Sequence, residues 1–285
     1  MTTTAWIFPG QGSQKIGMGA DLFEQSEHQE RLKLAEKILG WCVPEICQDP
    51  EDKISQTLYT QPSLYVLETL LVDKLKQQGQ SPDYVAGHSL GEYVALYAAG
   101  VFDFGTGLKL VQCRAELMNT AAGGQMAALI GFDREQLDQQ IQQTPNIVLA
   151  NDNSAAQVVI SGTPEAVDQV LANIKVKRAV KLNVSGAFHS PLMQEAATEF
   201  QQILDGISFN TAQIPVLSNV DPTPTTDGTL LKQRLTQQMT GSVRWREICL
   251  QLSILGVTQV VEIGPGNVLT GLMKRTCPEI LLKNI

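Results

Sequence analysis

Short aliphatic runs alternate with longer stretches of mixed apolar and polar residues along most of the chain. The aliphatic runs cover residues 5–8, 83–88, 214–218 and 258–263, and each leads into a turn. Spacing typical of amphipathic helices covers residues 61–78, 90–100, 107–122, 190–204 and 244–255. Strands that alternate with helices predict a largely parallel α/β sheet, with its chemistry at the carboxyl ends of the strands.

The segment between residues 125 and 189 has a different pattern. It predicts strand, helix, strand, strand, helix and strand at residues 126–131, 134–142, 146–151, 157–161, 165–174 and 178–184. This is the order of a ferredoxin-like unit. A weak internal repeat, "LIGFDREQLDQ" and "VISGTPEAVDQ", supports it. We therefore expect a ferredoxin-like subdomain at residues 125–189, inserted into a large α/β subdomain made of residues 1–124 and 190–285.

Composition and charge exclude several classes of protein. The chain has 285 residues, 43% of them hydrophobic, a net charge of −8 and no apolar run of membrane-spanning length. The negative charge argues against a nucleic-acid partner. Five cysteines without a CxxC pair and three histidines without metal-ligand spacing indicate neither a disulfide framework nor a metal site. No signal-peptide pattern is visible, so we expect a cytoplasmic protein. We also expect no cofactor.

The sequence Gly87-His88-Ser89-Leu90-Gly91 fits the G-x-S-x-G motif. A predicted strand precedes it and a predicted helix follows, so the turn would hold the Ser89 hydroxyl out from the sheet as a nucleophile. The Leu90 N–H, at the start of the helix, would stand beside it as a hydrogen-bond donor. The alternative is a serine that only caps a helix.

A serine nucleophile needs a base, and histidine is the usual one. His28 lies in the polar run "EQSEHQER" and is expected to be a solvated surface residue. His88 adjoins Ser89, where the sharp turn would direct the two side chains apart. By elimination the base is His189, in the loop "SGAFHSPL". The alternative is that His189 is an ordinary loop histidine.

Two further features have both a catalytic and a structural interpretation. The loop "FPGQGSQ" after the first strand lacks the P-loop Lys-Ser/Thr pair, so the Gln11 N–H is a candidate second oxyanion donor, or the loop is a plain turn. Arg114 lies on the apolar face of its predicted helix, where a guanidinium must be paired. Its partner is either an internal carboxylate such as Asp103 or an anionic substrate.

These motifs, in this order, resemble the malonyl-CoA:acyl carrier protein transacylases of type II fatty acid synthesis. The resemblance runs from "FPGQGSQ" through "GHSLGEY", "VQCRAELM" and "GAFHSPLM" to "VEIGPGNVLTGL", nearly the whole chain. It implies an α/β-hydrolase-like large subdomain with a ferredoxin-like insertion. It also implies an enzyme that transfers malonyl from malonyl-CoA, through an acyl-serine, to the phosphopantetheine thiol of acyl carrier protein.

The resemblance assigns roles residue by residue. Ser89 would be the nucleophile, His189 the base, and Gln11 and Leu90 the oxyanion donors. Arg114 would bind the malonyl carboxylate, and the main-chain carbonyl of Gln238 would orient the histidine. Met118 and Phe188 would belong to the substrate site, where Phe188 leaves no room for a methyl branch. Carrier proteins of this pathway are acidic, so docking on this acidic chain needs a local basic surface. The candidates are Lys175, Lys177, Arg178, Lys181, Arg244, Arg246, Lys274 and Arg275.

Two rival functions remain open from the sequence. A serine esterase or thioesterase could carry the same strand–turn–helix motif, because spacing does not show whether a thiol or water resolves the acyl-enzyme. The other rival is a noncatalytic module that binds a carrier protein or a phosphate through the Gly-rich loop. That module would form no covalent adduct.

Overall fold

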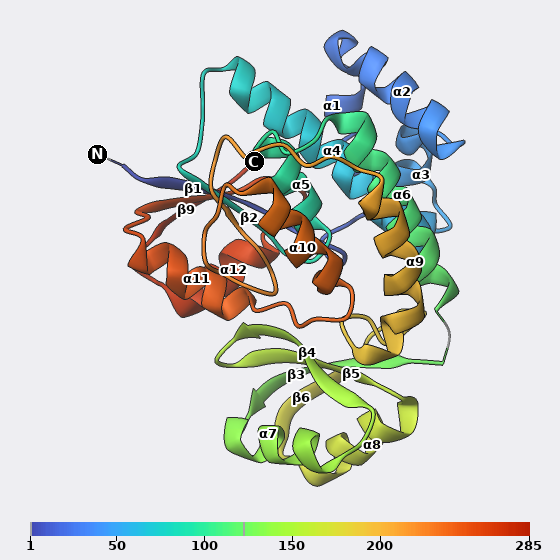
Figure 1. Cartoon of the computed structure of the whole chain (residues 1–285), viewed down its shortest axis with the longest axis vertical. Helices are drawn as coiled ribbons and strands as arrows, with labels where there is room; N and C mark the ends of the chain where they lie inside the picture. The colour runs from blue at the N-terminus through green and yellow to red at the C-terminus, as the bar shows by residue number, and fades with distance from the viewer. Residues whose placement is uncertain (1, 122) are drawn as a thin grey trace.

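The computed structural model describes residues 2–121 and 123–285 and consists of a large body and a small body (Figure 1). Met1 and Ala122, the last residue of the helix predicted over 107–122, lie outside the described residues. Among the described residues, no helix is both long and apolar enough to cross a membrane.

The large body is built on a five-stranded parallel sheet. Its strands are β1 (Thr4–Phe8), β2 (Tyr84–Gly87), β7 (Val216–Leu217), β8 (Gln259–Glu262) and β9 (Leu281–Asn284). Their order is β7-β2-β1-β8-β9. The four strands predicted from the aliphatic runs are therefore present and parallel. The fifth, β9, was not predicted, because this edge strand is largely exposed and has no clear alternation of apolar residues.

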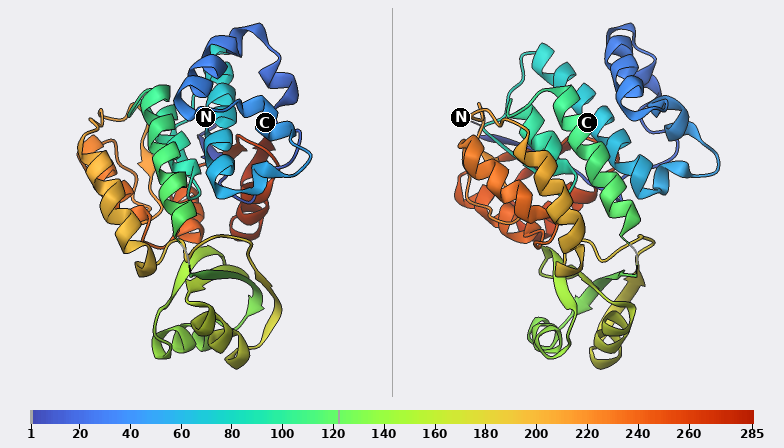
Figure 2. Two further views of the ribbon diagram at one scale, coloured as in Figure 1. Left: turned by 90° about the vertical axis from the view of Figure 1, so that its right-hand side faces the viewer. Right: turned by 45° about the vertical axis from the view of Figure 1, so that its right-hand side comes forward.

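Helices cover both faces of this sheet, so the large body has three layers (Figures 1 and 2). Trp6 and Phe8 of β1 face a core that also contains residues of α4 (Thr57–Gln77), α5 (Gly91–Ala98), α6 (Phe104–Thr120), α9 (Gln194–Asp205) and α10 (Gly228–Gln238). Ala5 and Ile7 of the same strand face α11 (Trp245–Ile254) and α12 (Val268–Thr276). Helices α1 (Ala20–Phe23), α2 (Gln29–Leu39) and α3 (Val43–Gln48) join the first core from outside.

Helix α4 differs from its prediction as an amphipathic helix. Every residue from Thr60 to Leu70 is buried, because α2, α3, α5 and α6 all pack against it. A helix surrounded in this way has no solvent face over these three turns. Its buried polar side chains, including Gln61, therefore have to find partners inside the protein.

The small body is a separate antiparallel sheet with its own core. The elements are β3 (Gln125–Phe132), α7 (Arg134–Gln143), β4 (Ile147–Ser154), β5 (Gln157–Gly162), α8 (Pro164–Asn173) and β6 (Val176–Lys181). The strand order β4-β5-β3-β6 and the element order are those of the predicted ferredoxin-like unit. Only the last strand is displaced, since its pairing with β3 begins at Val176 and ends at Lys181 rather than at residue 184. The exact limits of the two subdomains stay a prediction.

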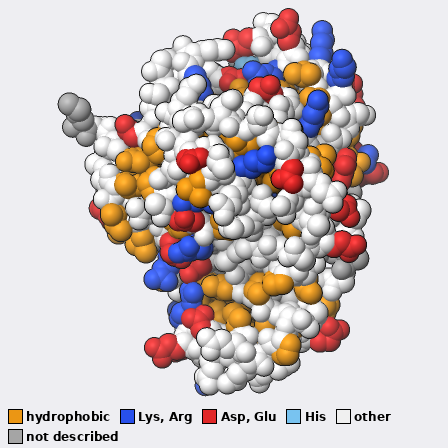
Figure 3. Space-filling model, in the orientation of Figure 1, with side chains coloured by type: hydrophobic (Ala, Val, Ile, Leu, Met, Phe, Trp, Pro, Cys, Tyr) orange, Lys and Arg blue, Asp and Glu red, His pale blue; other side chains and the backbone are white. Residues whose placement is uncertain are grey.

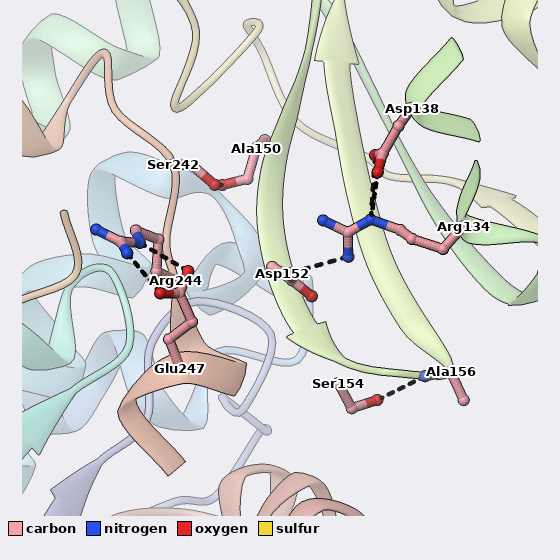
Figure 4. A network of polar contacts seen from close by, with 9 residues as sticks. All are labelled: Arg134, Asp138, Ala150, Asp152, Ser154, Ala156, Ser242, Arg244 and Glu247. Carbon is pink, nitrogen blue, oxygen red and sulfur yellow. Dashed lines mark hydrogen bonds and ion pairs between the residues drawn. The ribbon is translucent and has the colours of Figure 1, made fainter. Parts of the chain in front are cut away.

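The segment before α11 joins the two bodies at the edge strand β4, where Ser242 contacts Ala150 (Figure 4). Val243, in the segment before α11, forms a parallel bridge with Asn151. The Val243 N–H donates to the Ala150 carbonyl at 2.8 Å, and the Asp152 N–H donates to the Val243 carbonyl at 2.9 Å. The Ser242 hydroxyl also donates to the Ala150 carbonyl, at 3.2 Å. The large body thus covers an edge of the small sheet that would otherwise present unpaired backbone groups.

Candidate active site

Ser89 occupies a sharp turn between β2 and α5. Its φ of 53° lies in the left-handed region, which a residue with a side chain adopts only when its surroundings hold it there. The flanking glycines are required by close packing. A Cβ on Gly87 would lie 1.9 Å from the Gly91 carbonyl carbon, and a Cβ on Gly91 would lie 2.0 Å from the Phe8 oxygen. The turn is therefore pressed against the end of β1.

His189 is the histidine that reaches Ser89. Its Nε2 lies 2.8 Å from Ser89 Oγ, and its Nδ1 lies 2.9 Å from the main-chain oxygen of Gln238. A carbonyl accepts only, so Nδ1 carries the proton and the unprotonated Nε2 faces the serine. Burial and the nearby Arg114 guanidinium lower the pKa of His189 to about 3, which keeps the imidazole neutral. The pair can therefore move a proton from Oγ to Nε2.

The other two histidines lie elsewhere. His88 points away from Ser89, with its Nε2 2.8 Å from Asn153 Oδ1 and its ring 5.6 Å from the Trp245 ring. The expectation that His28 is a solvated surface residue is wrong, because only 3% of it is exposed. Its 3₁₀ turn, Ser26–His28, buries the side chain, whose Nε2 lies 3.5 Å from Glu27 Oε1.

Arg114 lies inside the protein beside Ser89. It is 1% exposed, and its guanidinium donates to Gln61 Oε1 at 2.6 Å, Ser89 Oγ at 3.0 Å and Gln238 Oε1 at 3.2 Å. Its Cζ also lies 5.4 Å from the centre of the Tyr93 ring. Burial lowers the pKa of Arg114, but a guanidinium stays protonated at neutral pH. Among the described residues, no carboxylate hydrogen-bonds to this cation.

The alternative that Asp103 pairs with Arg114 is wrong. Asp103 caps the start of α6, where its Oδ1 accepts from the Thr106 N–H at 2.7 Å. Arg114 lies three turns further along the same helix, roughly 16 Å away at 1.5 Å per residue. The carboxylate therefore neutralises the helix terminus and leaves Arg114 to other partners.

The Gly10–Gln11 loop packs directly on the Ser89 turn. A Cβ on Gly10 would lie 2.4 Å from the His88 carbonyl oxygen and 3.5 Å from the Leu90 nitrogen. The Gln11 side chain is engaged elsewhere, since its Nε2 donates to Thr57 Oγ1 at 3.0 Å. The backbone of this loop and the Leu90 N–H thus meet at the carboxyl ends of β1 and β2, the place expected for the chemistry of a parallel sheet.

The two apolar residues assigned to the substrate site are both buried. Phe188 immediately precedes His189 and is 5% exposed. Met118 is 2% exposed, and its sulfur accepts from Gln61 Nε2 at 3.4 Å. The Oε1 of the same Gln61 side chain accepts from Arg114. The Gln61 amide therefore lies between Met118 and the guanidinium and contacts both.

Sequence reasoning missed three polar residues of this site. Gln61 holds Arg114, Asn219 accepts from the Ser89 N–H at 2.7 Å, and Glu92 accepts from Gln238 Nε2 at 2.7 Å. Each is at most 1% exposed. The available signals were weak: Asn219 follows a strand of the parallel sheet, and Glu92 is a charge within the otherwise apolar start of α5.

One protein family matches nearly the whole chain. A family model described as "Acyl transferase domain" matches residues 5–283. The chain belongs to the acyl transferase family. This acyl transferase is 58% identical over 282 residues to the malonyl CoA-acyl carrier protein transacylase of Synechocystis, covering 99% of the chain and 96% of the relative.

Solved structures of acyl transferases have the same fold. The crystal structure of the Synechocystis malonyl-CoA:ACP transacylase matches with a TM-score of 0.98, covering 99% of this chain and 97% of that one. A malonyl-transacylase in complex with its type II polyketide acyl-carrier protein matches with a TM-score of 0.93 at 36% identity, covering 100% of this chain and 96% of that one. The predicted two-part α/β fold is therefore confirmed.

Proposed function

We propose that this acyl transferase moves malonyl from malonyl-CoA to the phosphopantetheine thiol of acyl carrier protein in fatty acid synthesis. The names of its relatives support this function. The observation that carries it is the position of Arg114, a buried cation 3.0 Å from the hydroxyl of Ser89. A site that places a guanidinium beside its nucleophile is suited to an acyl group that itself carries a carboxylate.

In the first half of the reaction Ser89 is acylated. Ser89 Oγ attacks the thioester carbonyl of malonyl-CoA while its proton passes to His189 Nε2. The tetrahedral intermediate then collapses, the C–S bond breaks, and His189 returns the proton to the CoA sulfur. The main-chain oxygen of Gln238, 2.9 Å from Nδ1, keeps the ring oriented and accepts from the imidazolium when it forms. The product is a malonyl ester on Ser89.

Two backbone donors would stabilise the developing oxyanion. Leu90 begins the turn into α5, so its N–H is among the free donors of that helix. The Gln11 N–H would supply the second donor from the loop that contacts this turn. Backbone N–H groups fixed in this way stabilise charge without reorganising during the reaction.

Arg114 would hold the malonyl carboxylate by two parallel hydrogen bonds. A guanidinium presents its donors as a planar fork that matches a carboxylate. Its present contacts are two neutral amide oxygens and one hydroxyl, so an anionic ligand offers a stronger, charge-assisted partner. The bulk of Phe188 at the same site would disfavour a methyl branch on the acyl chain.

In the second half the acyl group leaves. The carrier-protein thiol gives its proton to His189 and attacks the ester carbonyl, and Ser89 Oγ departs with that proton. We also propose a cytoplasmic location, because five free cysteines without disulfides are typical of a reducing compartment.

Intact-protein mass after mixing with malonyl-CoA tests the proposal. We expect a malonyl adduct on the wild type that persists until holo carrier protein is added, and we expect no adduct on a folded Ser89→Ala variant. Apo carrier protein, which lacks the thiol, is the matched control and should leave the adduct in place. Rapid CoA release without an acceptor would instead indicate a hydrolase, and the absence of any adduct would indicate a binding module.

A further inference from the structure

Gln238 contacts every charged or reactive group of the site. Its main-chain oxygen accepts from His189, its side-chain Oε1 accepts from Arg114 Nη2 at 3.2 Å, and its Nε2 donates to the Ser89 carbonyl at 2.8 Å. The side-chain amide can accept from Arg114 and donate to the Ser89 carbonyl in only one of its two orientations. The reverse orientation would place the NH₂ group against the guanidinium and the oxygen against the Ser89 carbonyl.

Glu92 decides which orientation Gln238 adopts. Its Oε2 lies 2.7 Å from Gln238 Nε2. Burial raises the pKa of Glu92, whereas the Asn219 N–H and Gln238 Nε2 both donate to its Oε2, as they would to an ionised carboxylate. Such a carboxylate has no proton to donate, so it favours the amide nitrogen over the amide oxygen. With Nε2 fixed toward Glu92, Oε1 necessarily faces Arg114. The carboxylate therefore acts on the guanidinium through one intervening amide.

The same carboxylate oxygen supports the turn that carries the nucleophile. Glu92 Oε2 also accepts from the Asn219 N–H at 3.1 Å. The Asn219 side chain in turn accepts from the Ser89 N–H at 2.7 Å and donates to the Gly87 carbonyl at 2.6 Å. Both backbone groups of the strained Ser89 are thus held by the side-chain amides of Asn219 and Gln238, two residues that also donate to Glu92 Oε2.

Because Glu92 contacts Arg114 only through Gln238, the guanidinium stays available to a substrate carboxylate. Glu92 is 1% exposed, so its charge needs compensation inside the protein. A direct ion pair would occupy the planar fork of Arg114 with an internal carboxylate. With Gln238 between the two charges, Glu92 compensates the cation electrostatically while the guanidinium contacts only neutral groups that a substrate can displace.

We propose that Glu92 is a positioning residue which, through Gln238, holds Arg114 where an acyl carboxylate can reach it and thereby sets the preference for carboxylated acyl groups. This inference rests on the proposed function. Glu92 touches no reacting atom, so its effect is expected in the selectivity between acyl groups as well as in the rate.

The variant Glu92→Gln tests the inference, because it removes the charge and keeps the shape. We expect the rate of Ser89 acylation by malonyl-CoA to fall about 10- to 100-fold, the effect of losing one charge-assisted hydrogen bond. Acylation by acetyl-CoA should fall less, so the malonyl-to-acetyl ratio should decrease. The matched control is Glu262→Gln, a buried carboxylate that accepts from the N–H groups of Leu269 and Thr270. It should lower the Tm and leave the ratio unchanged.

Gln238→Met provides a second test if Glu92→Gln does not fold. It removes the intervening amide and keeps the main-chain oxygen that orients His189, and it should decrease the same ratio. An unchanged ratio in the folded variants would overturn the inference.

Crystal structures of the substrate-free wild type and Glu92→Gln test the positioning role without any activity. We expect Arg114 to leave Gln238 Oε1 in the variant, and an unmoved guanidinium would overturn the inference. If the wild type forms no malonyl adduct, the proposed function fails, whereas these structures still decide the role of Glu92.

Discussion

Arg114 Nη2 and Ser89 Oγ are hydrogen-bonded to each other at 3.0 Å. The cation that we assign to the substrate carboxylate is thus in contact with the nucleophile before substrate arrives. A carboxylate that takes over this donor would release the serine oxygen from a contact that reduces its nucleophilicity. In the proposed reaction, binding of the acyl carboxylate and activation of Ser89 would be coupled through one nitrogen.

Replacing Arg114 should change which acyl group is transferred. Arg114→Ala should lower kcat/KM for malonyl-CoA by about 10²–10³-fold or more, since losing one partner of a buried charge pair costs about 3–5 kcal/mol. Transfer from acetyl-CoA should increase, because an acyl group without a carboxylate would no longer leave a buried guanidinium without an anionic partner. Arg114→Lys should be a poor malonyl transferase, because an ammonium lacks the planar fork. An unchanged malonyl-to-acetyl ratio beside a lowered Tm would assign Arg114 a structural role.

Removing the base should slow the first half of the reaction. His189→Ala should reduce the rate of Ser89 acylation by roughly 10²–10⁴-fold, the usual contribution of a general base. Stopped-flow release of CoA measures this rate directly. His88→Ala is the matched control, since His88 contacts Asn153 rather than the serine. Greater loss in the control than in His189→Ala would return the role of base to His88.

Acylation should remain active well below neutral pH. The pKa of His189 is lowered to about 3, so the neutral base is present above that value and is lost only as the pH falls toward it. A histidine with the ordinary value near 6.5 would be only about 3% neutral at pH 5. We therefore expect little decrease in the single-turnover acylation rate between pH 7.5 and 5. A decrease centred near 6.5 would contradict the buried neutral imidazole.

Two basic residues of the small body should contribute to docking of the carrier protein. Lys177 and Arg178 are exposed on the edge strand β6, whereas Lys181 pairs with Asp168 and Arg244 pairs with Glu247. On the face drawn in Figure 3, basic side chains are interspersed with acidic ones, so local groups matter more than net charge.

Reversing both charges, in Lys177→Glu/Arg178→Glu, should raise the KM for carrier protein and leave acylation by malonyl-CoA intact. The matched control is Lys33→Glu/Lys37→Glu on α2, at the opposite end of the molecule (Figure 1). Equal KM values in the two double variants would place the docking surface elsewhere.

The local sequence pattern predicted four strands of the parallel sheet and the small body. It failed for side chains whose burial and partners depend on segments distant in the sequence. The runs around β1, β2 and β8 and the turn at Ser89 are encoded by neighbouring residues, and the structure has them. The polar run around His28 does not indicate that this side chain is buried. Gln61, Glu92 and Asn219 come from separate elements, so no local spacing indicates that they meet around Arg114 and Ser89. The catalytic roles that the sequence analysis assigned stay predictions.

The junction at β4 connects the inserted body to the segment that follows Gln238. Val243 is hydrogen-bonded to Ala150 and Asp152, only a few residues after the carbonyl of Gln238 that orients His189. One position further along β4, Asn153 contacts His88, the neighbour of the nucleophile. A chimera that exchanges this body between acyl transferases must therefore reproduce the backbone pairing of β4 as well as a folded insert. Without that pairing, the segment from Gln238 to Val243 would lose its support, and His189 would lose the contact that orients it.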